Sequence, residues 1–245
     1  MIASTSVSYP EFPLLALEAA TAMGSVALFS DAGSVSSQAV AMGGGRGGGG
    51  GVSREDGLLP AIDALCTAHG IRVGEIRSLV CGSGPGSFTS LRIAASIAKG
   101  IAHASGAKLY AVSSLVLAAA GITQSGEYAI HADAMRAERF VQRVRIDESG
   151  MAHAVGTVAR VPVRLLDVYL NRMGSTRRVA VVASAAPEFE FATVIPSAAN
   201  TLRVSGLLAG GPVDRDSWEP AYGRLAEAQV KWESEHGRPL SQGVA

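Results

Sequence analysis

The chain has 245 residues, of which 48% are hydrophobic and 17% charged, and its 21 basic residues balance its 21 acidic residues. This length accommodates one large domain or two of ordinary size, with enough apolar residues for a sizeable core. The zero net charge gives no electrostatic sign of nucleic-acid binding, and no run of Lys or Arg points to DNA or to a membrane surface.

Cysteine usage and hydropathy indicate the compartment. Cys66 and Cys81 lie in apolar surroundings at a spacing that fits no metal motif, so we expect buried thiols in a reducing environment. The opening residues MIASTSVSYPEF have neither a basic start nor an apolar stretch, so no signal peptide is expected. No apolar run reaches the length of a membrane span. These features predict a cytoplasmic protein with no membrane contact.

The chain begins with predicted strands over Leu14 to Glu18, Ser25 to Phe29 and Ser34 to Ala41. The low-complexity stretch Gly43 to Gly51 then predicts an expanded, flexible polyglycine loop. Alternating helices and strands follow. The helices are predicted over Asp56 to His69, Phe88 to Ser105 and Leu115 to Ala120, and the strands over Ile76 to Cys81 and Lys108 to Val112. Ser53 or Asp56 can cap the first helix, which Gly70 ends, and Ser113 or Ser114 can cap the last.

The strand pattern then restarts with Tyr128 to Asp133 and Phe140 to Ile146. LLALEAATAMGSVAL and YAIHADAMRAERFVQRV each show an apolar strand that ends in a carboxylate, a short polar loop and a second strand, which suggests an internal duplication. Strands mixed with helices in two similar halves predict an α/β protein with two lobes. We place the N-terminal lobe at residues 1–113 and the C-terminal lobe at residues 114–245. In the second, a strand is expected over Val179 to Ala183, a helix over Asn200 to Gly210, and a helix at the end of the tail Glu219 to His236.

The glycine-rich stretch CGSGPGSFTSLRIAASIAKG, from Cys81 to Gly100, matches no phosphate-binding or catalytic motif. A P-loop needs a lysine after its last glycine, and Ser87 stands there instead. The glycines are spaced by two, which does not fit a dinucleotide fingerprint, and neither Ser83 nor Ser87 has the flanking glycines of a nucleophile elbow. The turn therefore has a mechanical role, in which Ser87 caps the helix that follows. A weak phosphate contact at the helix N-terminus stays an alternative.

The helix over Phe88 to Ser105 is apolar around most of its circumference. Its clearly polar residues, Arg92, Ser96, Lys99 and His103, fall in one narrow stripe. An ordinary surface helix has the reverse proportion. The helix is therefore expected to be buried either in its own domain, which is the commoner case, or against a partner. A second face of small residues on the Asp56 to His69 helix adds weight to the partner.

The stretch GSGPGSFTSLRIAASIAKGIAHASGAKLYAVSSL resembles the signature of the TsaB (YeaZ) family, G-x-G-P-G-S-F-T-G-L-R-I-G…A-K-G-L-A followed by V-S-S-L. Four further segments resemble family sequences in the same order: LLALEAATAMGSVAL, DGLLPAIDAL, HADAMRAERFVQRV and EPAYGRLAEAQVKWE. The resemblance spans about Leu14 to Glu233. Its signature turn consists of Gly82, Gly84, Pro85, Gly86, Ser87, Phe88 and Thr89.

The resemblance implies an α/β, two-lobed actin/Hsp70/sugar-kinase-like (ASKHA) fold built from duplicated ribonuclease H-like domains. TsaB-like proteins are non-catalytic partners of TsaD, the enzyme that places a threonylcarbamoyl group on the adenosine next to the anticodon of ANN-decoding tRNAs, and a TsaE-like ATPase joins them. The resemblance thus implies a subunit without cofactor, metal or catalytic residues of its own, a homodimer when alone, with ATP handled by its partners and tRNA contacted only indirectly.

In the family, the two helices matching Asp56 to His69 and Phe88 to Ser105 pair with the same helices of TsaD or of a second TsaB. The residues that we expect at this interface are Leu58, Ala61, Ile62, Leu65, Arg92, Ala95, Ser96, Lys99 and His103.

Departures from the family pattern favour a non-enzyme. The opening D-T-S-T is Glu18-Ala19-Ala20-Thr21, which weakens nucleotide binding in the first lobe. The glycine-rich turn of the second lobe is Ala183-Ser184-Ala185-Ala186, which makes a phosphate loop there unexpected, and the glycine of G-S-F-T-G is Ser90. A competing interpretation is an ATP-dependent small-molecule kinase or hydrolase of the same fold, for which Glu18 and Asp133 would be essential. A peptidase would need a metal pair or an activated serine, and the five histidines are scattered. His131 and Asp133 could share a site, or form an ordinary polar contact.

Overall fold

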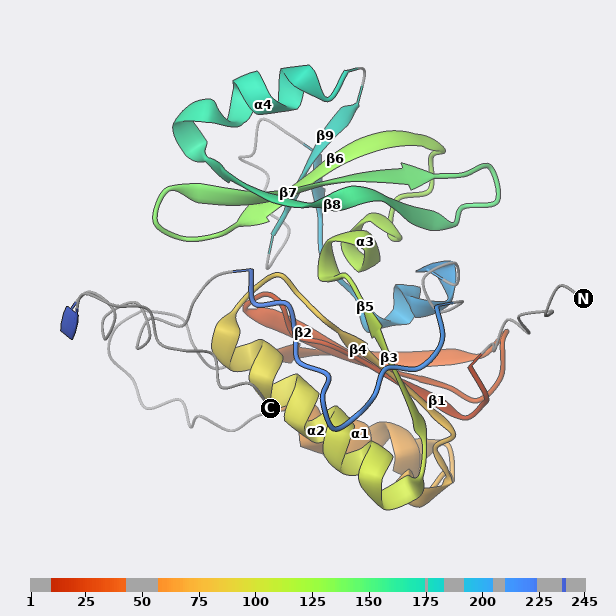
Figure 1. Ribbon diagram of the computed structural model, residues 1–245. Helices are drawn as coiled ribbons and strands as arrows, with labels where there is room; N and C mark the ends of the chain where they lie inside the picture. Colours follow the sequence, from red (N-terminus) through yellow and green to blue (C-terminus); the bar gives the residue numbers. More distant parts are fainter. Residues whose placement is uncertain are drawn as a thin grey trace, which may run out of the picture.

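The computed structural model describes residues 10–42, 57–174, 176–182, 192–204, 210–223 and 235–236. The described chain forms two five-stranded sheets, with strand orders β3-β2-β1-β4-β5 and β8-β7-β6-β9-β10 (Figure 1). The first sheet consists of β1 (Leu14–Glu18), β2 (Met23–Phe29), β3 (Val35–Ala41), β4 (Ser78–Gly82) and β5 (Lys108–Val112). The second consists of β6 (Gly126–Asp133), β7 (Glu138–Ile146), β8 (Ala152–Pro162), β9 (Arg177–Val181) and β10 (Ala192–Val194).

Both sheets have the same topology. In each, the first three strands in chain order pair antiparallel, and the fourth joins the first in parallel and carries the fifth in parallel. The prediction of a mixed α/β protein is confirmed, and this common topology is the one that a duplication would produce. The ASKHA assignment, the duplication of ribonuclease H-like units and the lobe limits stay predictions.

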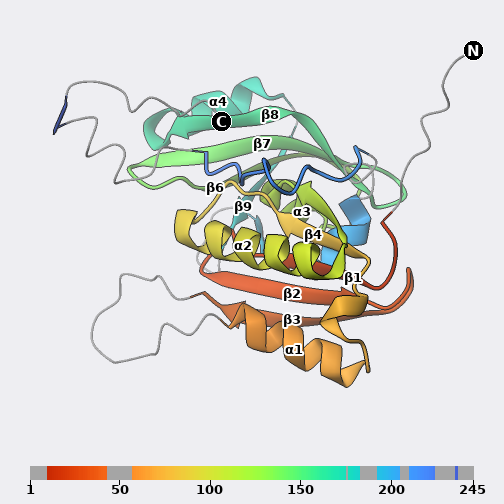
Figure 2. The ribbon, with the colours of Figure 1, turned by 60° about the horizontal axis from the view of Figure 1, so that its bottom comes forward.

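Helices separate and cover the two sheets. They are α1 (Leu58–Ala68), α2 (Phe88–Ser105), α3 (Ser114–Ala119) and α4 (Leu166–Arg172), with short 3₁₀ helices η1 (Val73–Glu75), η2 (Val163–Leu165) and η3 (Ala198–Val204). The first two helices cover the outer face of the first sheet, with α1 over β2 and β3 and α2 over β4 and its neighbours (Figure 2). Between the sheets lie α3 and η3, and α4 covers the outer face of the second sheet (Figure 1).

Strand β1 is buried on both faces, which explains its unbroken apolar sequence. Leu14 and Ala16 point into the core between the two sheets, whereas Leu15 and Leu17 point into the core under α1 and α2. All six residues of α3 are buried because this helix lies inside the first of these cores. The continuous core between the sheets ties the two halves of the chain together.

Helix α2 begins and ends where its capping residues predict. The Ser87 Oγ accepts a hydrogen bond from the Ser90 backbone N–H at 3.5 Å and another from the Ser90 Oγ at 3.0 Å. Gly106 adopts the left-handed conformation, with φ of 71°, at the C-cap. Between them, the buried Ala94, Ala98 and Ala102 keep the helix backbone close to the sheet.

Replacing Ser87 by alanine should lower the free energy of unfolding by about 1 kcal/mol, because the first turn of α2 then loses its side-chain acceptor. Urea unfolding followed by circular dichroism measures this change. The matched control is Ser96→Ala on the exposed face of the same helix, which should be neutral or slightly stabilising since alanine has the higher helix propensity. Equal losses at both positions would contradict the capping role.

Most sequence-predicted elements are confirmed. Leu14–Glu18, Phe88–Ser105 and Lys108–Val112 have the predicted limits. The other predicted strands and the first helix are present with ends shifted by at most two residues. The two cysteines are free and buried, as expected. Within the described ranges, no helix combines the length and the hydropathy of a membrane span.

Several predictions need correction. Helix α1 follows Gly57, which makes no side-chain cap, and α3 follows Ser113, whose hydroxyl bonds Gln142 instead of the helix end. The helix expected over Asn200 to Gly210 is, where described, the 3₁₀ helix Ala198–Val204. The tail Glu219 to His236 is expected only to end in a helix, and residues 219–223 are irregular while residues 235–236 are helical. Other predictions lie outside the described residues: the polyglycine loop Gly43 to Gly51, the caps Ser53 and Asp56, the turn Ala183 to Ala186, and residues 224–234 of the tail.

Candidate functional site

The signature turn joins β4 to α2 and is hydrogen-bonded to three other parts of the chain. The Ser83 N–H donates to the Val112 carbonyl at 2.7 Å, at the end of β5. The Gly84 N–H donates to the Ser114 Oγ at 3.1 Å, at the start of α3. The Ser87 N–H donates to the Ala20 carbonyl at 2.8 Å, in the loop after β1. The turn therefore fixes the N-terminus of α2 against both β1 and α3.

The glycines of the turn are required by close packing. A Cβ at Gly82 would collide with the Glu18 carboxylate, and one at Gly86 would collide with the backbone of Ala20. Gly84 has φ of +87°, and a Cβ there would lie 2.7 Å from the Ala221 carbonyl oxygen. The mechanical interpretation of the glycines agrees with this geometry, because each glycine lies against another segment of the chain.

Glu18 lies at the centre of this packing. Its side chain is fully buried at the end of β1, where Oε1 accepts from the Ala20 N–H at 2.6 Å and Oε2 accepts from the Ser114 Oγ at 2.8 Å. Burial raises the pKa of the Glu18 carboxyl to about 7, although the hydrogen bonds from Ala20 and Ser114 partly oppose this shift. Because Glu18 has no exposed surface, a phosphate or substrate could reach it only if the turn moved away.

The second carboxylate singled out by the strand repeat has a different environment. Asp133 is exposed, and its Oδ1 accepts the Met135 N–H at 3.0 Å. His131, two residues earlier on β6, is buried, so the pair does not form one open site. Within the described residues, His, Cys, Asp and Glu side chains do not gather in a group of three or more that could hold a metal ion.

Apart from Lys99, the predicted interface residues divide into two sets. Leu58, Ala61, Ile62, Leu65 and Ala95 are buried in this chain's own core, each at most 9% exposed. The first four pack between α1 and the first sheet, and Ala95 is also buried within this chain. Their contact with a partner stays a prediction. The other set is exposed on the side of α2 that faces away from the first sheet, and consists of Arg92, Ser96 and His103. Their contact with a partner also stays a prediction.

The exposed face of α2 combines small, apolar and basic residues. Thr89, Gly100 and Ala104 share this face with the three exposed polar residues, and Ile93 and Ile97 are half-buried along its edge. On α1, Leu59 is 53% exposed, and Ala64 and Ala68 are also exposed. Such a face lets another helix approach closely and gives it apolar surface to cover.

One flank of α2 is covered by residues 213–223 of the same chain, which we call the return segment (Figures 1 and 2). The Val213 N–H donates to the Leu109 carbonyl at 2.8 Å, and the Ala221 N–H donates to the Ser83 carbonyl at 2.7 Å. Lys99 forms an ion pair with Glu219 at 3.4 Å and lies 5.9 Å from the centre of the Trp218 ring. Lys99, predicted to face a partner, therefore contacts its own chain.

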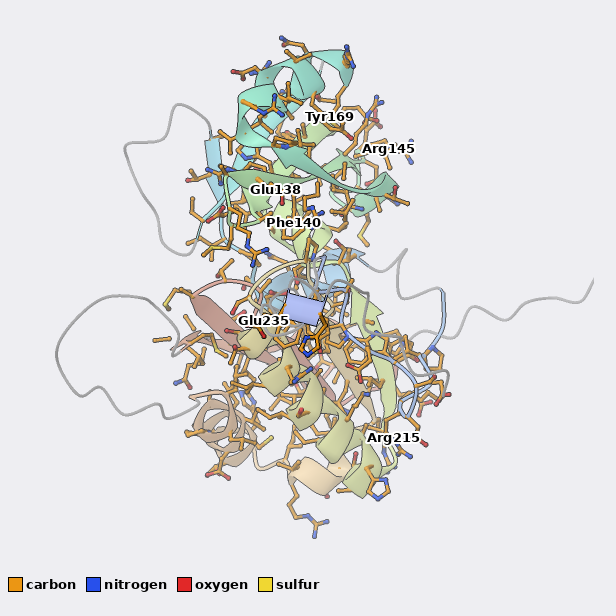
Figure 3. The ribbon with its side chains drawn as sticks, turned by 60° about the vertical axis from the view of Figure 1, so that its left-hand side comes forward. Glu138, Phe140, Arg145, Tyr169, Arg215 and Glu235 are labelled. Atoms are coloured by element: carbon orange, nitrogen blue, oxygen red, sulfur yellow. The ribbon has the colours of Figure 1, made fainter. Side chains whose placement is uncertain are left out.

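The return segment also connects the two sheets. Gly223 lies against Pro85 of the signature turn and against Phe140 on β7. Figure 3 shows Arg215 beside the first sheet, and Phe140 on the side of the second sheet that faces the first sheet. Sequence reasoning matched this segment to the family but did not place it on α2. Nor did it identify Ser114 as the partner of Glu18, although Ser114 lies in the V-S-S-L match.

The class of fold is defined by two sheets of the same topology with the buried helix α3 between them. In the first sheet, β4 leads into the glycine turn that anchors α2. Two solved structures from Pseudomonas aeruginosa share this fold: an uncharacterized protein described as similar to peptidase YEAZ, and YeaZ. Each superposes with a TM-score of 0.67 at 23% identity, the first over 86% of this chain and 99% of its own, the second over 85% and 98%. These likenesses show the fold.

The family follows from the sequence comparisons. Residues 54–209 match the family model described as TsaD, tRNA N6-adenosine threonylcarbamoyltransferase. The chain belongs to this family, and the predicted resemblance to its TsaB (YeaZ) members is confirmed. The tRNA threonylcarbamoyladenosine biosynthesis protein TsaB of Escherichia coli is 33% identical over 105 residues, 42% of this chain and 46% of that protein. Its namesake in Haemophilus influenzae is 36% identical over 58 residues, 24% and 25% of the two chains. The matches thus span less than half the length of these relatives.

Proposed function

We propose that this chain is a non-catalytic partner subunit in tRNA threonylcarbamoyladenosine biosynthesis. It binds a TsaD-like subunit through the exposed face of α2 and supports that subunit in modifying the adenosine next to the anticodon. A TsaE-like ATPase and the TsaD-like subunit handle ATP, and tRNA contacts this chain only indirectly. The names of the matching relatives support the pathway.

The observation that carries the partner role is the anchoring of α2. The signature turn fixes one end of a long helix whose outer face is small and partly apolar. A rigid helix with such a face loses little conformational entropy when another protein covers it. Neither the turn nor the helix positions a nucleophile or an exposed acid.

The competing kinase or hydrolase function has less support. It requires a carboxylate that reaches substrate, and Glu18 is fully buried with both oxygens bonded to Ala20 and Ser114. Asp133 is exposed but lies on the second sheet, where its Oδ1 accepts the N–H of Met135. The geometry around Glu18 instead favours a structural role for this carboxyl.

The partner role predicts that Ser96→Arg abolishes a complex with the TsaD subunit of the same organism. Ser96 is exposed in the middle of α2, so an arginine there blocks close approach without entering the core. Ala95 is unsuitable for this test because it is buried. The matched control is Val168→Arg on α4, where the native side chain is 51% exposed.

Size-exclusion chromatography with light scattering measures the complex. We expect wild type and Val168→Arg to elute with TsaD, and Ser96→Arg to elute alone with an unchanged circular dichroism spectrum. A wild type that never binds TsaD would contradict the proposed function. Retention of the complex by Ser96→Arg would show that another surface carries it.

A further inference from the structure

The carboxyl group of Glu18 lies where four segments of the chain meet. Its Oε1 accepts from the Ala20 N–H in the loop after β1, and its Oε2 accepts from the Ser114 Oγ at the start of α3. The Ser114 Oγ in turn accepts from the Gly84 N–H of the signature turn at 3.1 Å. At the end of β4, Gly82 lies so close that a Cβ there would collide with the carboxylate. We call these five residues the Glu18 cluster.

The surroundings of Glu18 contain no charge that would balance a carboxylate. The segments around it come from residues 19–29, 82–91 and 113–120, and these ranges contain no Asp, Glu, His, Lys or Arg. Within the described part of the chain, Glu18 takes part in no ion pair. The neighbouring titratable group is the Cys81 thiol on β4, whose pKa is raised by burial and by Glu18, so the thiol stays neutral. An ionised Glu18 is therefore a buried charge without a counter-charge, which is costly.

The cluster fits a protonated carboxyl. Burial raises the pKa of Glu18 to about 7, so the group changes its charge close to neutral pH. A carboxylate formed at this position gains solvation only if one of the surrounding segments moves. Strands β1 and β4 and helix α3 are buried along their whole length, whereas the signature turn includes half-buried and exposed residues. The turn is therefore the segment that can move with the smallest loss of packing.

Movement of the turn would release the start of α2. Two hydrogen bonds hold the turn closed, from the Gly84 N–H to the Ser114 Oγ and from the Ser87 N–H to the Ala20 carbonyl at 2.8 Å. Ser87 is also the N-cap of α2. An outward movement that brings water to Glu18 breaks both bonds, and the first turn of the helix then loses its fixed position.

We infer that Glu18 is a proton-dependent switch, which holds the signature turn closed on the β1 loop and α3 when protonated, and opens the turn and frees the start of α2 when ionised. The inference concerns regulation and rests on the proposed function, in which a TsaD-like subunit binds the exposed face of α2. A partner that needs the anchored helix binds in proportion to the closed fraction, so its apparent affinity falls as the turn opens.

The direction of the switch follows from two pKa values of Glu18. In the closed turn the pKa is about 7, whereas a carboxyl that has reached solvent has the ordinary value of 4.5. Raising the pH between these values therefore favours the open turn, by up to about 300-fold over the whole window. Above the higher value both forms are ionised and the equilibrium changes no further. The closed turn belongs to the acidic side.

Hydrogen exchange followed by mass spectrometry measures the opening directly, at the Gly84 and Ser87 amides. Wild type is compared with Glu18→Gln at the same pH, so the intrinsic exchange rates cancel. Glutamine has the shape of the protonated acid and keeps the turn closed at every pH. Between about pH 5.5 and about pH 7.5 the ratio of the wild-type rate to the variant rate should rise about 20-fold. A ratio that stays constant would overturn the inference, and peptides from β6 and β7 serve as the internal control.

Ser114→Ala is the second variant, in case Glu18→Gln fails to fold. It removes the hydroxyl that joins Glu18 to Gly84. The Gly84 amide should then exchange fast at both pH values, because the closed turn has lost its connection to the carboxyl. Exchange in Ser114→Ala that keeps the wild-type pH dependence would also overturn the inference.

The consequence for the partner is measured by isothermal titration calorimetry with the TsaD subunit of the same organism. The affinity of wild type relative to Glu18→Gln should fall about threefold to 20-fold between about pH 5.5 and about pH 7.5. The ratio cancels the titration of TsaD itself and of the exposed His103 on α2. An unchanged ratio would overturn the regulatory inference and leave the proposed function intact. Absence of wild-type binding at both pH values would contradict the proposed function, and the exchange experiment still decides whether the switch exists.

Discussion

Gly86→Ala should destabilise the protein by about 3 kcal/mol or more, or prevent folding, because the added Cβ collides with backbone atoms and not with a mobile side chain. The ideal Cβ position lies 2.6 Å from the Ala20 Cβ and 2.7 Å from the Ala20 Cα. Moving apart would also break the hydrogen bond from the Ser87 N–H to the Ala20 carbonyl, at the start of α2. The loss is therefore one of packing and of helix anchoring together.

Gly100→Ala is the matched control for this substitution. Gly100 lies in α2, and a Cβ there meets no atom within 4 Å. Alanine at an open helical position should stabilise the fold by about 0.5–1 kcal/mol, because glycine is the less favourable residue in a helix. Urea unfolding measures the free energy of unfolding of both variants and of wild type. A Gly86→Ala protein as stable as wild type would show that the turn does not pack against the β1 loop as described.

The parts of the fold that the sequence predicts best are those with strong local signals. Strand β1 is an unbroken apolar run, and α2 has a serine at its start and a glycine at its end. Strand β8 was missed because it is largely exposed or half-buried and shows no clear alternation. Helix α4 was missed because it has only seven residues and follows directly from η2.

The candidate site was predicted less well because its contacts join distant parts of the chain. Glu18 bonds Ser114 across 96 positions, and Lys99 reaches Glu219 across 120. Spacing along a helix shows that α2 has a polar stripe and a small-residue face, but not which side its own sheet covers. The helical spacing therefore predicts that Ala95 faces a partner, whereas its side chain is buried within this chain. No local pattern reports such pairings.

The buried carboxyl of Glu18 should make the protein less stable as the pH rises. Its pKa in the folded protein is about 7, above the ordinary value of 4.5 that applies to the unfolded chain. Between these two values the folded state holds a proton that the unfolded state has released, so stability falls with increasing pH. Over this window the loss amounts to about 3 kcal/mol.

His131 opposes this trend over part of the same range. Burial, together with the nearby charges of Arg139 and Arg178, lowers the pKa of its imidazole from 6.5 to about 4. Below about pH 6.5 the unfolded state therefore binds a proton that the folded state does not, and stability falls with decreasing pH. Between pH 4.5 and 6.5 the two effects offset one another. The wild-type profile alone would therefore hide the contribution of Glu18.

The difference in unfolding free energy between wild type and Glu18→Gln isolates the contribution of Glu18, since His131 and all other groups are common to both proteins. Glutamine has the shape of the protonated acid and can replace its hydrogen bonds, so the two proteins should be similarly stable near about pH 4.5. Near about pH 8 the variant should be more stable by as much as about 3 kcal/mol, as measured by urea unfolding at each pH. A variant that is less stable by a constant amount at every pH would mean that Glu18 stays ionised in the fold. In that case the hydrogen bonds from Ala20 and Ser114 would outweigh the cost of burying the charge, and the kinase alternative would regain an ionised carboxylate.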